Sequence, residues 1–295
     1  MHINPRTMLY ILTIAQEQNF SRAAEKLFIS QPSLSQHILR AEKELNVSLF
    51  RRDVTPLVPT YAGERMIAAA REFFLLEDRL SREMEDIAGE RVGRITVGAS
   101  VTRGAYIIPG LFSSFKREYP EVELILKEGS NDMLLDLVFS GQADFAFVGS
   151  ADSNFEQISL RNDELLLAVP KAHPLLQSLP PDTSSVRLEL FKNLPFILLH
   201  KGQALRNIAD QIFKDHGIKP LVAYETHSYD IACQMAASGL GCTFIIENAP
   251  FYHEGASKFH LEKGIYSYPL LMVYRKNTYL SAPMKHLIGM AQRIF

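Results

Sequence analysis

The clearest pattern in the chain lies between residues 31 and 45, where apolar and polar positions recur at helical spacing on opposite sides. The apolar stripe consists of Leu34, Ile38, Ala41 and Leu45. The other side carries small polar groups and one cation, namely Ser33, Gln36, His37 and Arg40. A helix that buries one face and presents small donors and acceptors on the other can lie in the major groove of DNA. This stretch favours a regulator over an enzyme.

Two shorter helical patterns precede this helix. Their inward-facing residues are Met8, Leu9, Ile11, Leu12 and Ala15 in the first, and Ala23, Ala24 and Leu27 in the second, which Phe20 precedes. Small alanines let two helices cross closely, as a helix-turn-helix requires. Ser21 is the predicted N-cap of the second helix and Ser30 that of the third, whose first turn accommodates Pro32. The prolines between Arg51 and Thr60 exclude a long helix and favour a short β-ribbon, or wing.

A long helix is predicted from Thr60 to about Ala88. Apolar residues recur every seven positions at Met66, Phe73, Leu80 and Ile87, with Ala69 and Leu76 between them and Glu83 interrupting that second series. Such heptads are typical of a coiled-coil seam, and the alternative is a helix packed on its own domain. A helix of about 28 residues is ~40 Å long. We favour dimerisation, because a small neighbouring domain could not cover that length.

Predicted strands and helices alternate through the rest of the chain. The strands fall at residues 95–98, 122–127, 145–148, 165–169, 196–199, 222–224, 243–246 and 270–274. The first predicted helix follows the strand at 95–98 and ends at about residue 118. The others fall at residues 132–140, 205–216, 230–237 and 282–294. This alternation indicates parallel sheets covered by helices, hence an α/β fold. Small ligands of such sheets bind beyond the carboxyl ends of the strands.

Charge and composition change this picture little. The net charge is −2, and residues 1–65 carry eight basic and six acidic residues, so charge alone would not suggest DNA. No apolar run approaches the ~18 residues that a membrane span needs, and the N-terminus lacks a signal-peptide pattern. We therefore expect a cytoplasmic protein with no membrane partner.

The order of these parts resembles that of the LysR-type transcriptional regulators over essentially the whole chain. The N-terminal motifs that carry the resemblance are Ser21-Arg22-Ala23-Ala24, Ser30-Gln31-Pro32-Ser33-Leu34-Ser35, Leu49-Phe50-Arg51-Arg52 and Thr60-Tyr61-Ala62-Gly63. Those of the remainder include Tyr119-Pro120, Gly129-Ser130, Gly141-Gln142-Ala143-Asp144, His173-Pro174-Leu175 and Gly239-Leu240-Gly241. One departure is Glu247, which follows Ile246 where the family often has proline.

The resemblance implies three parts. These are a winged helix-turn-helix over residues 1–59, a dimerising linker helix over 60–89, and an effector domain over 90–295 that is like a periplasmic binding protein. That domain has two lobes, the first about 94–160 with 270–295 and the second about 165–266. Such proteins are commonly homotetramers built as pairs of dimers, and they bind a double-stranded DNA operator and a small-molecule effector. RNA polymerase is a further candidate partner.

Candidate DNA contacts cluster in the predicted recognition helix and the wing. They are Gln31, Pro32, Ser33, Ser35, Gln36, Arg40, Arg51, Arg52 and Thr60. Gln36 suits an adenine edge, and Arg40 suits guanine or a phosphate. Arg51, Arg52 and Thr60 are better suited to phosphates, since a wing with adjacent charges positions the protein rather than reading bases. The alternative for each polar residue is that it merely faces water.

Candidate effector contacts follow the predicted strands of both lobes. They are Ser100, Thr102, Ser130, Gly149, His200, Lys201, Thr226 and His227. Hydroxyls and free N–H groups at helix N-termini favour an anion. Together with Lys201, His200 or Arg103 as a cation, they fit a small organic acid. The alternative is that each Ser or Thr only caps a helix.

Two other hypotheses, a redox role for the cysteines and an enzymatic function, have less support from the sequence. Cys233 and Cys242 are nine residues apart, as are the reactive cysteines of the family's peroxide sensors, but Ala204 and Phe213 occupy the corresponding positions here. We therefore expect buried, inert thiols. An enzyme, or a DNA-binding protein without a ligand switch, is the alternative function. Ser113-Ser114-Phe115-Lys116 fits Ser-x-x-Lys, but its partner motifs are absent, so we predict no catalytic residue, cofactor or metal.

Overall fold

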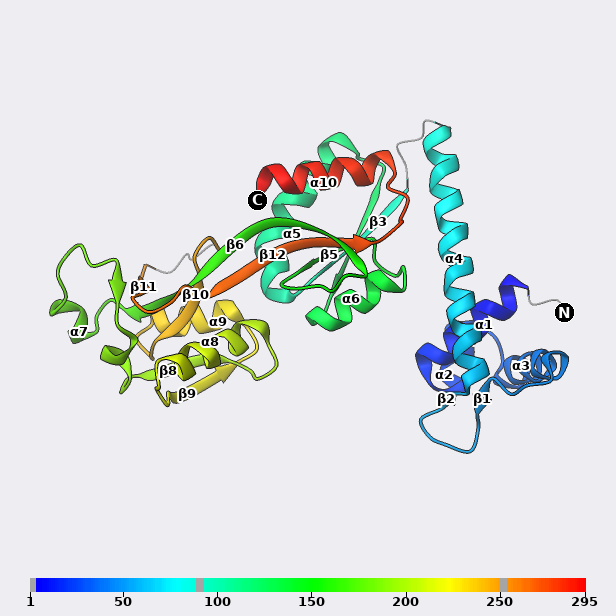
Figure 1. The fold of residues 1–295 in the computed structure, drawn as a ribbon, viewed down its shortest axis with the longest axis horizontal. Helices are drawn as coiled ribbons and strands as arrows, with labels where there is room; N and C mark the ends of the chain where they lie inside the picture. Colours follow the sequence, from blue (N-terminus) through cyan, green and yellow to red (C-terminus); the bar gives the residue numbers. More distant parts are fainter. Residues whose placement is uncertain (1–3, 89–92, 250–253) are drawn as a thin grey trace. The chain divides into compact units, whose positions relative to one another are not determined.

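The computed structural model describes residues 4–88, 93–249 and 254–295 (Figure 1). The chain forms two compact units, Met1–Ala88 and Gly89–Phe295, each considered by itself below. Among the described helices, none has the length and apolar character to cross a membrane.

Three helices begin the first unit. They are α1 (Pro5–Glu17), α2 (Phe20–Lys26) and α3 (Gln31–Leu45). The Ser30 side chain caps α3 by accepting from the Ser33 N–H, as predicted, and Pro32 lies in its first turn. The predicted cap of α2 is wrong. Asn19, rather than Ser21, accepts from the first free N–H groups, because the helix begins at Phe20 and Ser21 already lies inside it.

The core of the first unit is formed where these helices meet. Tyr10, Ile11 and Ile14 from α1 pack with Ala23 and Ala24 from α2, and Leu34 and Ile38 of α3 complete the core. The wing follows as an antiparallel pair, β1 (Phe50–Arg51) and β2 (Val58–Pro59). The predicted wing is therefore present, and Arg51 lies in its first strand.

Helix α4 (Tyr61–Ile87) has two different halves. In the first half, Gly63, Ile67 and Ala70 are buried against the unit's own core, a stripe that the predicted heptads did not contain. In the second half, apolar side chains stay exposed, namely Leu76, Leu80, Met84 and Ile87. Packing on its own domain, the alternative for this helix, thus holds for the first half only.

The second unit contains a two-lobed α/β arrangement, and its first lobe holds a mixed sheet. Strands β3 (Arg94–Ala99), β4 (Glu123–Glu128) and β5 (Phe145–Val148) are parallel, with β3 in the middle. Helices α5 (Val101–Glu118) and α6 (Asn131–Phe139) connect them. Strand β12 (Ser267–Arg275) joins antiparallel to β5, and α10 (Ala282–Ile294) packs on α5.

The second lobe is built around the far end of one long strand. Strand β6 (Phe155–Pro170) pairs with β12 in the first lobe and with β10 (Thr243–Ile246) and β11 (Ala256–Leu261) in the second. Strands β8 (Pro195–Leu199) and β9 (Leu221–Thr226) form a parallel pair. The remaining elements are α7 (Pro174–Gln177), β7 (Ser185–Val186), a short 3-10 helix (Leu188–Phe191), α8 (Ala204–Asp215) and α9 (Tyr229–Ala237).

The predicted parallel pairing is present for β3, β4 and β5 and for β8 and β9, but it does not extend to the other predicted strands. β6, β10, β11 and β12 meet antiparallel, because β6 and β12 cross between the lobes in opposite directions. Each lobe keeps its own buried core on its side of this crossing, one around Phe115 and Phe145 and the other around Phe196 and Phe213. Figure 1 shows β6 and β12 running side by side from one lobe to the other.

Candidate functional site

Helix α3 presents a continuous polar surface to solvent. Gln31, Pro32, Ser33, Gln36 and Arg40 are exposed, whereas Leu34 and Ile38 beneath them are fully buried. The buried stripe fixes the helix on its unit, so the exposed side chains are displayed from a rigid element. Among the described residues, no Asp or Glu side chain forms a salt bridge with Arg40. This surface is suited to reading base edges.

One predicted member of the polar face lies elsewhere. His37 is half-buried, with its Nε2 2.9 Å from Thr7 Oγ1 and its ring edge-on to Tyr10 of α1. Burial lowers the pKa of His37, and the nearby cations Arg6 and Arg40 lower it further. His37 therefore packs α3 onto α1 as a neutral ring, and the helical spacing placed it on the wrong face.

The wing is tied to α3 through a buried carboxylate. Glu42 Oε1 accepts from the backbone N–H of Leu49 at 2.7 Å and of Phe50 at 3.3 Å. Its Oε2 accepts from Arg52 Nη2 at 3.1 Å, and Arg52 also donates to Ser35 Oγ at 3.2 Å. Arg52 and Ser35, both candidate DNA contacts, are thus already joined across the helix–wing boundary.

The other two wing candidates have local partners as well. Arg51 pairs with Asp53 at 3.1 Å, and both side chains are well exposed, so this pair contributes little. Thr60 Oγ1 donates to Ser48 O and accepts from the Gly63 N–H, which caps α4. Thr60 therefore has a structural role in the free protein.

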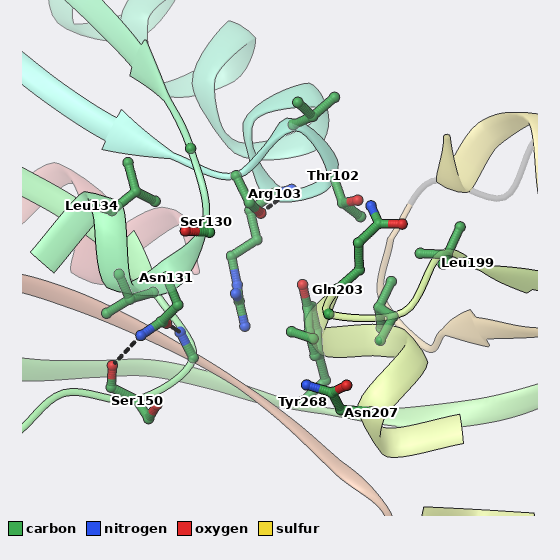
Figure 2. Close-up of a pocket in the computed structure, with 18 of the residues that line it drawn as sticks. Thr102, Arg103, Ser130, Asn131, Leu134, Ser150, Leu199, Gln203, Asn207 and Tyr268 are labelled. Atoms are coloured by element: carbon green, nitrogen blue, oxygen red, sulfur yellow. Dashed lines mark hydrogen bonds between the residues drawn. The ribbon is translucent and has the colours of Figure 1, made fainter. Parts of the chain in front are cut away.

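A cavity of about 630 Å³ lies between the two lobes of the second unit. Its walls include the N-terminal turns of α5, α6 and α8 and the β12 residues Tyr268 and Pro269 (Figure 2). Of the predicted effector contacts, five line it, namely Ser100, Thr102, Ser130, Gly149 and His227. The other three, His200, Lys201 and Thr226, are not among its lining residues.

The turn after β8 explains this difference. His200 stacks on His227 with ring centroids 3.8 Å apart, and Gly202 then reverses the chain with a φ of +89°. Gln203 locks the turn, because its Oε1 accepts from the His200 N–H and its Nε2 donates to His227 O. As a result Gln203 and Asn207, rather than Lys201, join His227 in the second lobe's polar wall.

The Ser100 and Ser130 hydroxyls of the first lobe cap helices, which was the alternative interpretation of these residues. Ser100 Oγ accepts from the Arg103 N–H at 3.3 Å, and Ser130 Oγ accepts from the Met133 N–H at 3.4 Å. A hydroxyl that accepts in this way still has its own O–H to donate. The Ser130 hydroxyl can therefore cap its helix and still donate to a ligand, whereas the Ser100 hydroxyl also hydrogen-bonds with the Tyr268 side chain.

Arg103 is the cation that faces the cavity. The residue is 3% exposed, and its guanidinium reaches from α5 into the space beside Tyr268 (Figure 2). An added Cβ at Gly149 would come within 3.0 Å of Arg103 Nη2, so the glycine makes room for the guanidinium. Asn207 and Tyr268 were not predicted, because Asn207 lies within α8 and Tyr268 within β12, and neither directly follows a strand end.

The two cysteines lie apart from this chemistry. Both are buried, and burial raises the pKa of the Cys233 and Cys242 thiols to about 12. Such thiols are poor nucleophiles at neutral pH. Among the residues that the structure describes, no group of three or more His, Cys, Asp or Glu side chains is arranged to hold a metal.

Comparison with known proteins identifies the family. A model described as the LysR substrate binding domain matches residues 88–295, and one described as a bacterial regulatory helix-turn-helix protein, lysR family, matches residues 5–64. The chain belongs to the LysR family of transcriptional regulators. This LysR regulator is 30% identical over 294 residues to YcgK of Bacillus subtilis (strain 168), an uncharacterised HTH-type transcriptional regulator, covering 94% of this chain and 90% of YcgK.

Other relatives agree with this assignment. A probable RuBisCO transcriptional regulator of Porphyra purpurea is 30% identical over 244 residues, which are 80% of this LysR regulator and 75% of the relative. A full-length OxyR variant from Pseudomonas aeruginosa has the same fold, with a TM-score of 0.71, 23% identity, and coverage of 99% of this chain and 94% of that one. The predicted fold class is confirmed: a winged helix-turn-helix, a long linker helix and a two-lobed α/β effector domain like a periplasmic binding protein.

Proposed function

We propose that this LysR regulator binds a specific operator through α3 and is switched by a small organic anion held between its lobes. The observation that carries the proposal is the exposed polar face of a capped, well-packed α3 in a chain of this family. The cavity between the lobes supports the ligand switch.

The candidate DNA contacts divide into two groups. Gln31, Pro32, Ser33, Gln36 and Arg40 are free on the exposed face and are assigned to base edges. Ser35, Arg51, Arg52 and Thr60 have local partners, which suits them to hold the wing and to meet the DNA backbone.

Equilibrium binding of the whole chain to duplexes from its own upstream region tests the DNA proposal. The operator should bind more tightly than a random duplex at every salt concentration, and equal binding would refute specific regulation. Arg40→Ala should cost about 1–3 kcal/mol and relax base preference at one position. Arg51→Ala, the matched wing variant, should weaken all sequences alike and flatten the salt dependence.

The anionic nature of the effector is supported by local electrostatics. The N-terminal turns of α5 and α6 both face the cavity and carry unpaired N–H groups, and Arg103 adds a positive charge. A ligand at about 100 times its Kd should raise stability by about 2.7 kcal/mol in a thermal-shift screen of small acids. Thr102→Ala and Ser130→Ala should remove that response. Operator binding that no compound alters would instead support a DNA-binding protein without a ligand switch.

We propose that two copies of the chain associate through α4, so that the dimer presents two copies of α3 to DNA. The exposed stripe of Leu76, Leu80, Met84 and Ile87 is the apolar surface that a second copy would cover. We expect a dimer or a tetramer by light scattering. Leu80→Glu should shift the distribution toward smaller species, whereas the exposed charge change Arg71→Glu on the opposite side of the helix should not.

A further inference from the structure

Arg103 carries a buried positive charge that the protein itself does not neutralise. Its Nη2 donates to the Pro269 carbonyl at 2.6 Å, and its guanidinium carbon lies 4.0 Å from the centre of the Tyr268 ring. Its Nε has no hydrogen-bond partner among the described residues. No carboxylate of those residues forms a salt bridge with it.

Two other arginines of this unit, the buried Arg206 and the partly exposed Arg161, each have a carboxylate partner. Arg206 is 5% exposed and pairs with both Asp210 and Glu225. Arg161 pairs with the buried Asp163 at 2.7 Å. A buried charge without a counter-charge lowers stability, so proteins rarely retain one without a use.

Two acidic groups in the same environment, Tyr268 and Asp163, do not supply the missing charge. Burial raises the pKa of Tyr268, so its phenol remains neutral beside the guanidinium. Asp163 already holds Arg161 and also accepts from Asn248 Nδ2 at 2.8 Å. Arg103 therefore faces the cavity as a cation with no ion-pair partner among the described residues.

The three amide side chains of the described cavity lining divide into hydrogen-bonded and free ones. The amide of Asn131 is used on both ends, by the Gly149 N–H and the Ser150 carbonyl, and the amide of Gln203 is used on both ends within its turn. The Asn207 amide makes no hydrogen bond within the described residues, and Figure 2 shows it facing the cavity near Tyr268. A neutral donor and acceptor is thus free on the second lobe's wall.

We infer that the effector is a monocarboxylate whose anionic group binds Arg103 and whose other end carries a neutral hydrogen-bonding group that meets Asn207. The inference rests on the proposed ligand switch and specifies its chemical class. The described lining contains no other Lys or Arg, and Asp132 adds an exposed carboxylate, so a second anionic group would be repelled. Phosphate esters fit less well, since they carry close to two negative charges at neutral pH.

A matched set of compounds tests the class. Thermal shift and calorimetry of the whole chain would compare 5-hydroxypentanoate, 5-hydroxypentanamide and glutarate. The series would extend each class, the ω-hydroxy acids, the ω-hydroxy amides and the diacids, from three to eight carbons. Inorganic phosphate would be measured beside them. The hydroxy acids of a suitable length should bind, and the amides and diacids of equal length should bind at least 10-fold more weakly. Equal or tighter binding of diacids, amides or phosphate would overturn the inference, as would binding by no member of the set.

Variants of the same protein test the role of Arg103. Arg103→Met should weaken the best hydroxy acid about 10- to 100-fold, because a charged hydrogen-bonding partner is lost. Its melting temperature without ligand should not fall, whereas that of Arg206→Met should, since only the latter leaves carboxylates unpaired. Gly149→Ala retains the charge but crowds the guanidinium, and it should weaken the same compound several-fold.

Lys201→Met is the control, because Lys201 lies outside the cavity lining, and it should bind the compound like the wild type. Retained affinity in Arg103→Met and Gly149→Ala would overturn the role of Arg103. Specific operator binding by the wild type, measured separately, distinguishes a failure of this inference from a failure of the proposed function.

Discussion

Glu42 should be the residue on which the joint between α3 and the wing depends. Its side chain is 10% exposed, and its two oxygens accept from the Leu49 N–H, the Phe50 N–H and Arg52 Nη2. Leu49 and Phe50 are themselves buried, so water cannot replace the carboxylate as their acceptor. Glu42→Ala therefore removes the acceptor of two buried N–H groups at once.

The magnitude follows from these contacts. Each buried donor left without an acceptor costs about 1–3 kcal/mol, and the half-exposed Arg52 adds less than about 1 kcal/mol because solvent screens it. We expect Glu42→Ala to destabilise the first unit by about 4 kcal/mol. Glu42→Gln keeps an oxygen acceptor and loses only the charge, so its cost should be about 1–2 kcal/mol.

Hydrogen exchange read by mass spectrometry is the suitable assay. The chain has no tryptophan and forms two compact units, so a melting curve alone would not assign a loss of stability to the first unit. Peptides covering α1 and α3 should exchange about three orders of magnitude faster in Glu42→Ala. Glu44→Ala, an exposed neighbour on α3, should stay within about 0.5 kcal/mol of the wild type. Unchanged exchange in Glu42→Ala would refute the reasoning, and equal effects of Ala and Gln would assign the stability to charge rather than to the acceptor.

Three other predictions use the same physical arguments. Phe28 has a φ of +55° and is 95% exposed, so Phe28→Asn should stabilise the first unit by about 0.5–1 kcal/mol in the exchange assay; a loss would mean that the ring makes a contact worth more than the strain. A hydrogen bond from its own backbone N–H, aided by Lys263, lowers the pKa of Glu189 to about 2. The ionised Glu189 therefore stabilises the folded protein above pH 4.5, and this contribution is lost as the pH falls toward 2. Between those pH values the free energy of unfolding should change less in Glu189→Gln than in the wild type, by on the order of 1 kcal/mol after solvent screening. Parallel pH profiles of the melting temperature for the two proteins would contradict this. Cys233 and Cys242 should resist a thiol reagent at pH 8 until urea is added, since only about 10⁻⁴ of each is thiolate, and fast labelling of the folded protein would disprove their burial.

The elements that local sequence specifies were predictable, and those that depend on distant pairing were not. The third helix and its Ser30 cap were predicted because capping and helical periodicity act within a few residues. Only residues 165–169 of β6 were predicted. That half is buried in the second lobe, whereas the half before it carries exposed Glu156 and Gln157 and becomes a strand by pairing with β12, about 110 residues away. Strand β11 was missed for the same reason, since Lys258 and His260 interrupt its apolar pattern.

The cavity was predictable in its first lobe because its residues sit at helix N-termini directly after strands. Ser100 and Ser130 each lie between a β-strand and the helix that they cap, and this local arrangement can be recognised in the sequence. In the second lobe the same rule selected Lys201. The positive φ of Gly202 and the stack of His200 on His227 turn the chain so that Gln203 follows into the wall instead. Neither the turn nor the stack could be read from strand ends alone.

The position of Arg103 shows that a stronger signal was present in the sequence. Arg103, Ile107, Leu111 and Phe115 are spaced by four residues along α5, and all four are buried. A cation that continues an apolar stripe is predicted to enter the core, where it needs a counter-charge. Arg206 meets that need partly within its own helix, because Asp210 follows it by four residues, whereas the residue four after Arg103 is Ile107. A buried arginine whose helix supplies no acid must find its anion elsewhere, and in this fold the cavity between the lobes is the space that its guanidinium reaches.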